Sequence, residues 1–161
     1  MKIGETIDLV HASTTDLAEE LRKVAGRHAT DHAVYHVGRL LAGCCDDLAN
    51  GLRPFAERYH QSVEDHQSDV LQELGARVRH RSAELFGRSE KTGMLLLRDL
   101  RELATDAHGV QMDWTVLRQG ALVARDQALL ETATAGVEEI KRVVAWLSTT
   151  IKESAPQILA G

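Results

Sequence analysis

The spacing of the apolar residues constrains the fold of this chain more than any other feature. In the first segment a mainly apolar stripe recurs every four and three positions, at Ile3, Ile7, Val10, Thr14, Leu17, Leu21 and Val24. An α-helix has about 3.6 residues per turn, so this spacing places the residues on one helical face. The chain also has only 2 prolines in 161 residues and almost none of the Val/Ile/Thr alternation typical of strands. We therefore expect an all-α protein.

Three further stripes have the same period. The second contains Val34, Val37, Leu41, Cys44, Leu48, Leu52, Phe55 and Tyr59. The third contains Leu96, Leu100, Leu103, Ala107, Val110, Trp114, Leu117 and Ala121. The last contains Leu129, Ala133, Val137, Ile140, Val144, Leu147 and Ile151. Together the stripes predict helices over approximately 3–25, 30–60, 92–124 and 127–153, in a single domain that spans residues 1–161.

Glycine, threonine and proline indicate where the first two helices end and begin. Gly26 is expected to end the first helix in a left-handed conformation, and Thr30 to cap the second. Pro54 lacks an amide donor, so it either kinks the second helix or begins a new one after Asn50–Gly51. The sequence leaves both alternatives open.

The boundaries of the last two helices follow from similar signals. The side chain of Asp126 is expected to cap the final helix, which Pro156 then closes. Gly120 is a rival position for the turn before the final helix. Asp126 is therefore interpreted as a structural residue.

The connection between the second and third predicted helices is long. Residues 61–91 are polar and carry only a weak helical stripe, which predicts a crossover that contains a short helix. Short turns, in contrast, separate the helices within each pair. We therefore expect two short-looped helical hairpins joined by a long crossover, which is one of the topologies of four-helix bundles.

The last hairpin carries a family resemblance. Residues 124–147 read ARDQALLETATAGVEEIKRVVAWL. An aspartate follows an alanine-containing helix end, and the next apolar helix carries the paired acids Glu138 and Glu139. This stretch resembles the turn and last helix of the ferritin-like proteins. The resemblance implies a ferritin-like bundle, in which inward-facing glutamates and Glu-x-x-His pairs hold two metal ions.

The metal ligands that this resemblance implies are only partly present. The chain has one Glu-x-x-His pair, Glu57 and His60, and Glu64 follows at a spacing found in haemerythrin-like proteins. Glu57 and His60 lie roughly 120–140° from the apolar stripe of their helix, because each residue turns the helix by about 100°. The spacings His80–Glu84 and His108–Asp113 are also haemerythrin-like, and we interpret them as chance matches in a chain with 8 histidines.

Three histidines are the most distinctive local pattern. His28, His32 and His36 are spaced four residues apart, and Asp31 lies among them. Residues four apart share a helical face, so His32 and His36 are candidate ligands of one divalent metal, zinc or iron. His28 and Asp31 are candidate third ligands. The alternative interpretation is a solvated histidine face, since His32 and His36 lie outside the apolar stripe.

Composition limits the partners and the compartment. The formal net charge of −5 argues against nucleic acid as a main partner. Apolar runs such as Met94 to Leu97 are too short to cross a membrane. Cys44 and Cys45 are adjacent and cannot form a disulfide framework, which favours a cytoplasmic location.

These observations favour a non-catalytic binding or scaffolding protein, with homo-oligomers as a candidate form of assembly. The alternative is a ferritin-like or haemerythrin-like metal-binding protein, either an iron store or a di-metal oxidase, with an atypical set of ligands. Metal content separates the two hypotheses.

Overall fold

The computed structural model describes residues 2–61 and 92–160 of the chain. They form the helices α1 (Ile3–Arg27), α2 (His32–Gly51), α3 (Arg53–Gln61), α5 (Thr92–Ala124) and α6 (Gln127–Ala160). The described ranges contain no strand, which confirms the prediction of an all-α protein. The predicted crossover and its short helix lie outside these ranges, as do Glu64, His80 and Glu84.

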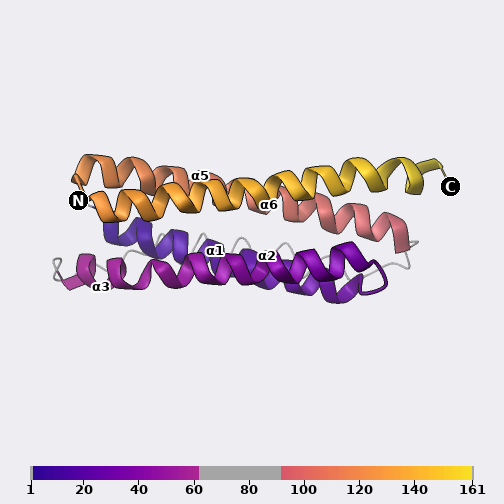
Figure 1. Cartoon of the computed structure of the whole chain (residues 1–161), viewed down its shortest axis with the longest axis horizontal. Coiled ribbons are helices and arrows are strands. Elements are labelled where there is room, and N and C mark those ends of the chain that lie inside the picture. The colour runs from indigo at the N-terminus through magenta and orange to yellow at the C-terminus, as the bar shows by residue number, and fades with distance from the viewer. Residues whose placement is uncertain (1, 62–91, 161) are drawn as a thin grey trace.

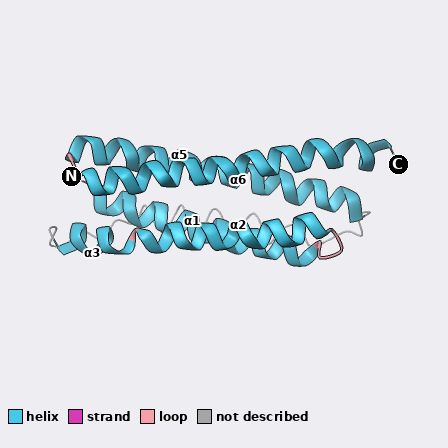
Figure 2. Ribbon diagram, in the orientation of Figure 1, coloured by secondary structure: helices cyan, strands magenta, loops and turns pink. Residues whose placement is uncertain are grey.

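The long helices lie side by side as two hairpins (Figure 1). One hairpin is α1 with α2, and the other is α5 with α6; Figure 2 shows the loops of both hairpins at the ends of the molecule. In Figure 1 the colour gradient runs in one direction along α1 and α6 and in the opposite direction along α2 and α5. The hairpins meet mainly where α1 packs on α5, while α2 contacts α6 over a smaller area.

The interior is built from the apolar stripes of α1 and α5, which are buried along their whole lengths as predicted. The stripe of α6 is buried as well, except that Val144 and Ile151 are only partly covered. The neighbouring Val143 is buried in place of Val144, because α6 turns Gly136 and Val143 toward the interior.

The prediction for the buried face of α2 was wrong, because most of the residues that are buried lie one position after the predicted ones. The residues of α2 that are buried are Val34, Gly38, Ala42, Cys45 and Ala49. The predicted Val37, Leu41, Cys44 and Leu48 are only partly covered. Small side chains let α2 approach α1 closely: a Cβ at Gly38 would lie 3.2 Å from the Cβ of Ala25. Close backbone approach, rather than bulk hydrophobicity, therefore sets the orientation of α2.

Two predicted boundaries near the first turn were also wrong. Gly26 does not end α1 in a left-handed conformation, since the helix continues to Arg27 and the backbone N–H of His28 donates to the Val24 carbonyl. The N-cap of α2 is Asp31 rather than Thr30, because an Asp31 carboxylate oxygen accepts a hydrogen bond from the Val34 N–H at 3.1 Å.

The two prolines behave differently. Of the two alternatives for Pro54, the new helix is observed: α2 ends at Gly51, and Pro54 lies in the first turn of α3, where a missing amide donor costs little. Pro156 does not close α6, which continues to Ala160. The side chain of Ile158, beyond this proline, lies against Gly93 of α5, and this contact keeps the end of α6 packed.

Candidate functional site

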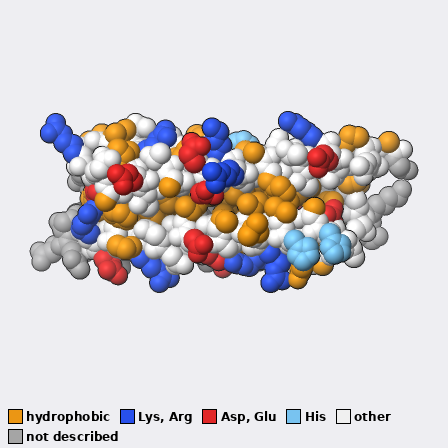
Figure 3. All heavy atoms as spheres, viewed as in Figure 1, with side chains coloured by type: hydrophobic (Ala, Val, Ile, Leu, Met, Phe, Trp, Pro, Cys, Tyr) orange, Lys and Arg blue, Asp and Glu red, His pale blue; other side chains and the backbone are white. Residues whose placement is uncertain are grey.

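The four histidine-region candidates do not converge on one point. His32 and His36 are both exposed, and their ring centroids lie 5.5 Å apart. Figure 3 shows adjacent histidine side chains on the surface of the viewed face. His28 instead points into the protein, and the Asp31 carboxylate caps α2. The structure therefore brings together only the pair His32 and His36.

The alternative candidates on α3 are separated too. The Nε2 atom of His60 lies 2.8 Å from a carboxylate oxygen of Asp8 on α1, and Glu57 is exposed. The haemerythrin-like candidate His108 is exposed on α5, with Nδ1 2.7 Å from the Ala104 carbonyl oxygen. Within residues 2–61 and 92–160, no three His, Cys, Asp or Glu side chains are placed to hold one metal ion.

A buried ionic cluster joins the two hairpins near the end of α1. The Asp99 carboxylate lies 2.7 Å from His28 Nε2, and Arg27 donates to both of its oxygens at 2.9 Å. The side chains of His28 and Asp99 are only 4% and 6% exposed. A carboxylate in such a position needs charged or hydrogen-bonding partners, because burial removes its water. We interpret the cluster as the polar contact that holds α1 against α5.

Asp99 was missed by sequence reasoning. It lies between Leu96 and Leu100 of the predicted apolar stripe, and a carboxylate within such a stripe is the one signal that was available.

Beside the cluster is a shallow hollow of about 210 Å³ between the ends of α1, α5 and α6. Its lining is His28, Thr30, Asp31, Thr92, Gly93, Leu96, Ser154, Gln157 and Ile158.

A second polar cluster lies at the opposite end, around Asp126. Its carboxylate accepts hydrogen bonds from the Leu129 N–H at 3.0 Å and the Tyr59 hydroxyl at 2.8 Å, and it pairs with Arg58. Burial raises the pKa of Asp126, but these hydrogen bonds and the Arg58 charge outweigh burial and leave the pKa below its ordinary value. The predicted cap is confirmed, and the rival turn at Gly120 is excluded because α5 continues to Ala124.

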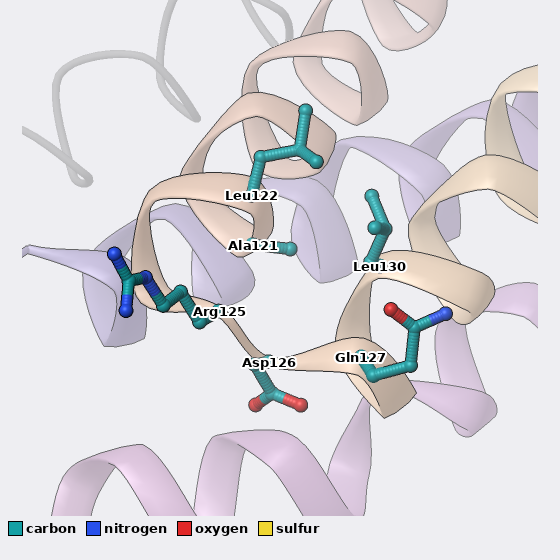
Figure 4. Close-up of a pocket in the computed structure, with 6 residues that line it drawn as sticks. All are labelled: Ala121, Leu122, Arg125, Asp126, Gln127 and Leu130. Atoms are coloured by element: carbon teal, nitrogen blue, oxygen red, sulfur yellow. The ribbon is translucent and has the colours of Figure 1, made fainter.

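The turn beside Asp126 encloses a hollow of about 250 Å³ (Figure 4). Its lining is Ala121, Leu122, Arg125, Asp126, Gln127 and Leu130. Arg125 makes the turn with a positive φ of 55°. In Figure 4 the Asp126 carboxylate points away from Leu122 and Leu130, toward the neighbouring helices. The Asp126 carboxylate therefore caps α6 and contacts Arg58 and Tyr59 of α3.

The two cysteines have different surroundings. Cys45 is buried, and burial raises the pKa of its thiol to about 12. A thiol with such a pKa stays protonated at neutral pH and is a poor nucleophile. Cys44 is partly exposed beside it, on the side of α2 that faces outward.

Large apolar side chains are exposed on α2, α5 and α6. Leu40 of α2 is 67% exposed, and Val123 of α5 is 76% exposed. Met112 and Val116 extend the exposed residues of α5 along one face, since Val116 follows Met112 by four residues and Val123 follows Val116 by seven. Figure 3 also shows a hydrophobic band along the viewed face, between α6 and α2.

Comparison of the chain with protein-family models, with curated proteins and with solved structures gives no significant match. Among the described residues, no helix combines the length and apolar character that a membrane span requires.

Proposed function

We propose that this chain is a non-catalytic four-helix bundle of ferritin-like topology that acts by binding or scaffolding through the outer faces of its helices. The direction of the helices supports the topology. The helices α2 and α5 run in the same direction, which is the orientation expected of two hairpins joined by a crossover.

The exposed apolar side chains carry the proposal. Leu40 on α2 and the series Met112, Val116 and Val123 on α5 have between 54% and 76% of their surface in contact with solvent. Single exposed apolar residues are ordinary, but several at helical spacing on one face are typical of an interaction surface. The buried polar groups of the described residues, in contrast, all have hydrogen-bond partners inside the protein.

The proposed compartment is the cytoplasm. Cys44 and Cys45 are both free thiols, although they are adjacent and one is partly exposed. A reducing compartment keeps such thiols free.

The test is metal analysis of protein purified without a histidine tag, followed by incubation with ferrous iron in air. The proposal predicts less than one tightly bound iron per chain and no catalysed iron oxidation. Stoichiometric iron, or oxidation faster than in a buffer control, would overturn it in favour of the ferritin-like oxidase or store.

One observation favours a second function, the binding of a divalent metal at the surface. His32 and His36 present two exposed imidazoles from adjacent turns of α2. Two imidazole ligands bind zinc with only modest affinity, and a third ligand from Asp31, His28 or another copy of the chain would complete the site. In the structure Asp31 and His28 are engaged elsewhere, which leaves another copy as the source of a third ligand.

A further inference from the structure

The outward side of α2 carries an apolar face that other helices cover only in part. We define the α2 face as Val37, Leu40, Leu41, Cys44 and Leu48. Leu40 is 67% exposed, and the other four are partly covered. The reason is the packing described above: small residues turn toward α1, so the larger apolar side chains of α2 face outward and toward α6.

The space above this face is open. A Cβ built at Gly43, next to Leu40 on the outward side of α2, would meet no atom within 4 Å. The missing side chain leaves room for a side chain from another molecule beside Leu40. The hydrophobic band in Figure 3 shows that the apolar surface continues from α2 toward α6.

Charges divide the solvent-facing side of α2, next to the α2 face, into two halves. The N-terminal half carries His32, His36 and Arg39, and the C-terminal half carries Asp46 and Asp47. Arg39 donates to the Tyr35 hydroxyl at 2.8 Å, and Asp46 pairs with Arg22. Asp47 is exposed and forms no ion pair within the described part of the chain.

We propose that the α2 face is the interface of a two-fold homodimer in which α2 pairs antiparallel with α2 of a second copy, about an axis near Leu41. This proposal deepens the proposed function, on which it rests, by naming the partner. In an antiparallel pair the same edges of the two helices meet with their ends reversed. The Arg39 half of each copy then faces the Asp47 half of the other, and the apolar residues are covered between them.

The charges favour this occupant over the alternatives. A parallel pair would instead set the two basic halves at one end of the interface and the two acidic halves at the other, so that like charges lie at the same level. The exposed series on α5, Met112, Val116 and Val123, has no such charged edge: the charged residues from Met112 to Val123 are Asp113 and Arg118, which are five positions apart and therefore lie on different sides of the helix. The α2 face is thus apolar, and the charged side of α2 next to it is complementary to itself in an antiparallel pair.

The first experiment measures the mass of the full chain in solution by sedimentation equilibrium over a range of concentrations. We expect a monomer–dimer equilibrium for the wild type. Leu40→Glu should raise the dimer dissociation constant by about tenfold or more, because it places a charge in the apolar centre of the interface. Val123→Glu is the matched control, since Val123 is at least as exposed but lies on α5; it should leave dimerisation unchanged.

The second experiment tests the antiparallel direction by charge reversal. Arg39→Asp and Asp47→Arg should each weaken the homodimer, because each places like charges opposite one another. An equimolar mixture of the two variants should form a heterodimer, since both contacts are then attractive. Helical content by circular dichroism establishes that the variants fold.

A wild type that stays monomeric, a dimer disrupted by Val123→Glu but not by Leu40→Glu, or a mixture that fails to associate would each overturn the proposal. None of these results would alter the metal content, so failure of the dimer is distinguishable from failure of the proposed function.

Discussion

The indole of Trp114 occupies the space in which residue 136 would carry its side chain. A Cβ built at Gly136 would lie 2.1 Å from Trp114 Cε3, far inside any allowed contact. Trp114 is fully buried, and its Nε1–H donates to the Thr14 hydroxyl at 2.9 Å. Trp114 on α5 thereby packs against α6 at a position that has no side chain, and it forms a hydrogen bond with α1.

This relationship predicts that Gly136→Ala destabilises the protein, although alanine is the better helix former. The added methyl group must displace Trp114, and overpacking of this kind costs about 1–3 kcal/mol. Urea unfolding followed by circular dichroism measures the change. Gly109→Ala is the matched control: its Cβ would meet nothing within 4 Å, so it should stabilise the protein by about 1 kcal/mol through helix propensity alone. Equal effects of the two substitutions would contradict the packing described.

The cap at Asp126 makes a second prediction. Asp126→Ala should cost about 0.5–2 kcal/mol of stability, because the Leu129 N–H loses its acceptor. Asp126→Asn should lose less, since the amide oxygen still accepts that hydrogen bond. Chemical unfolding of the three proteins at neutral pH compares them, and an alanine variant as stable as the wild type would be inconsistent with the cap.

The same residue predicts a dependence on pH. The pKa of Asp126 is lower in the folded protein than in the unfolded chain, so its carboxylate stabilises the fold above the ordinary value of about 3.9. This contribution is lost as the pH falls below that value through the folded pKa. The stability difference between the wild type and Asp126→Asn should therefore shrink on acidification, as unfolding measured from neutral to acidic pH would show. A difference that grows instead is the contrary result.

The buried cluster of His28, Arg27 and Asp99 predicts that His28 contributes more to the stability of the fold than His32 does. His28→Ala should cost about 1–3 kcal/mol, because the Asp99 carboxylate stays buried and loses a hydrogen-bond partner. His32→Ala is the control; its exposed side chain should contribute within about 0.5 kcal/mol. Thermal or urea unfolding separates the two, and similar losses would show that His28 is not structural.

Sequence and structure agree where neighbours along the chain decide the outcome. The stripes of α1 and α5 and the cap at Asp126 follow from local spacing and chemistry, so they were predictable. The buried face of α2 was not, because the contact of Gly38 with Ala25 depends on a partner helix and small residues carry a weak hydrophobic signal.

The candidate site was less predictable for the same reason. His28 and Asp99 are 71 positions apart in the sequence, and nothing local pairs them. The spacing of His28, His32 and His36 indicated one shared site, but α1 continues to Arg27 and turns His28 inward, away from the other two.

Zinc binding tests what remains of that site. If His32 and His36 bind zinc, the double variant His32→Ala/His36→Ala should lose the affinity seen in the wild type, whereas His108→Ala, exposed on α5, should keep it. Binding should weaken on acidification, since protonated imidazole does not ligate. Isothermal titration measures the affinity; equal affinities in all three proteins would leave the pair as a solvated face.

The claim that this protein acts through the outer face of α2 has one most direct test. Ala33, Leu40 and Asp47 lie seven residues apart and share the outward side of α2. Each is replaced by cysteine in a Cys44→Ser background and treated with a short bismaleimide; Cys45 is buried, and its raised pKa of about 12 keeps it unreactive.

In an antiparallel pair centred near Leu41, position 40 lies close to its counterpart, whereas positions 33 and 47 lie roughly 15–25 Å from theirs along the axis, at about 1.5 Å per residue. The account predicts that Leu40→Cys crosslinks to a covalent dimer, that Ala33→Cys and Asp47→Cys alone do not, and that a mixture of those two does. No crosslinking at position 40, or equal self-crosslinking at all three positions, would contradict it.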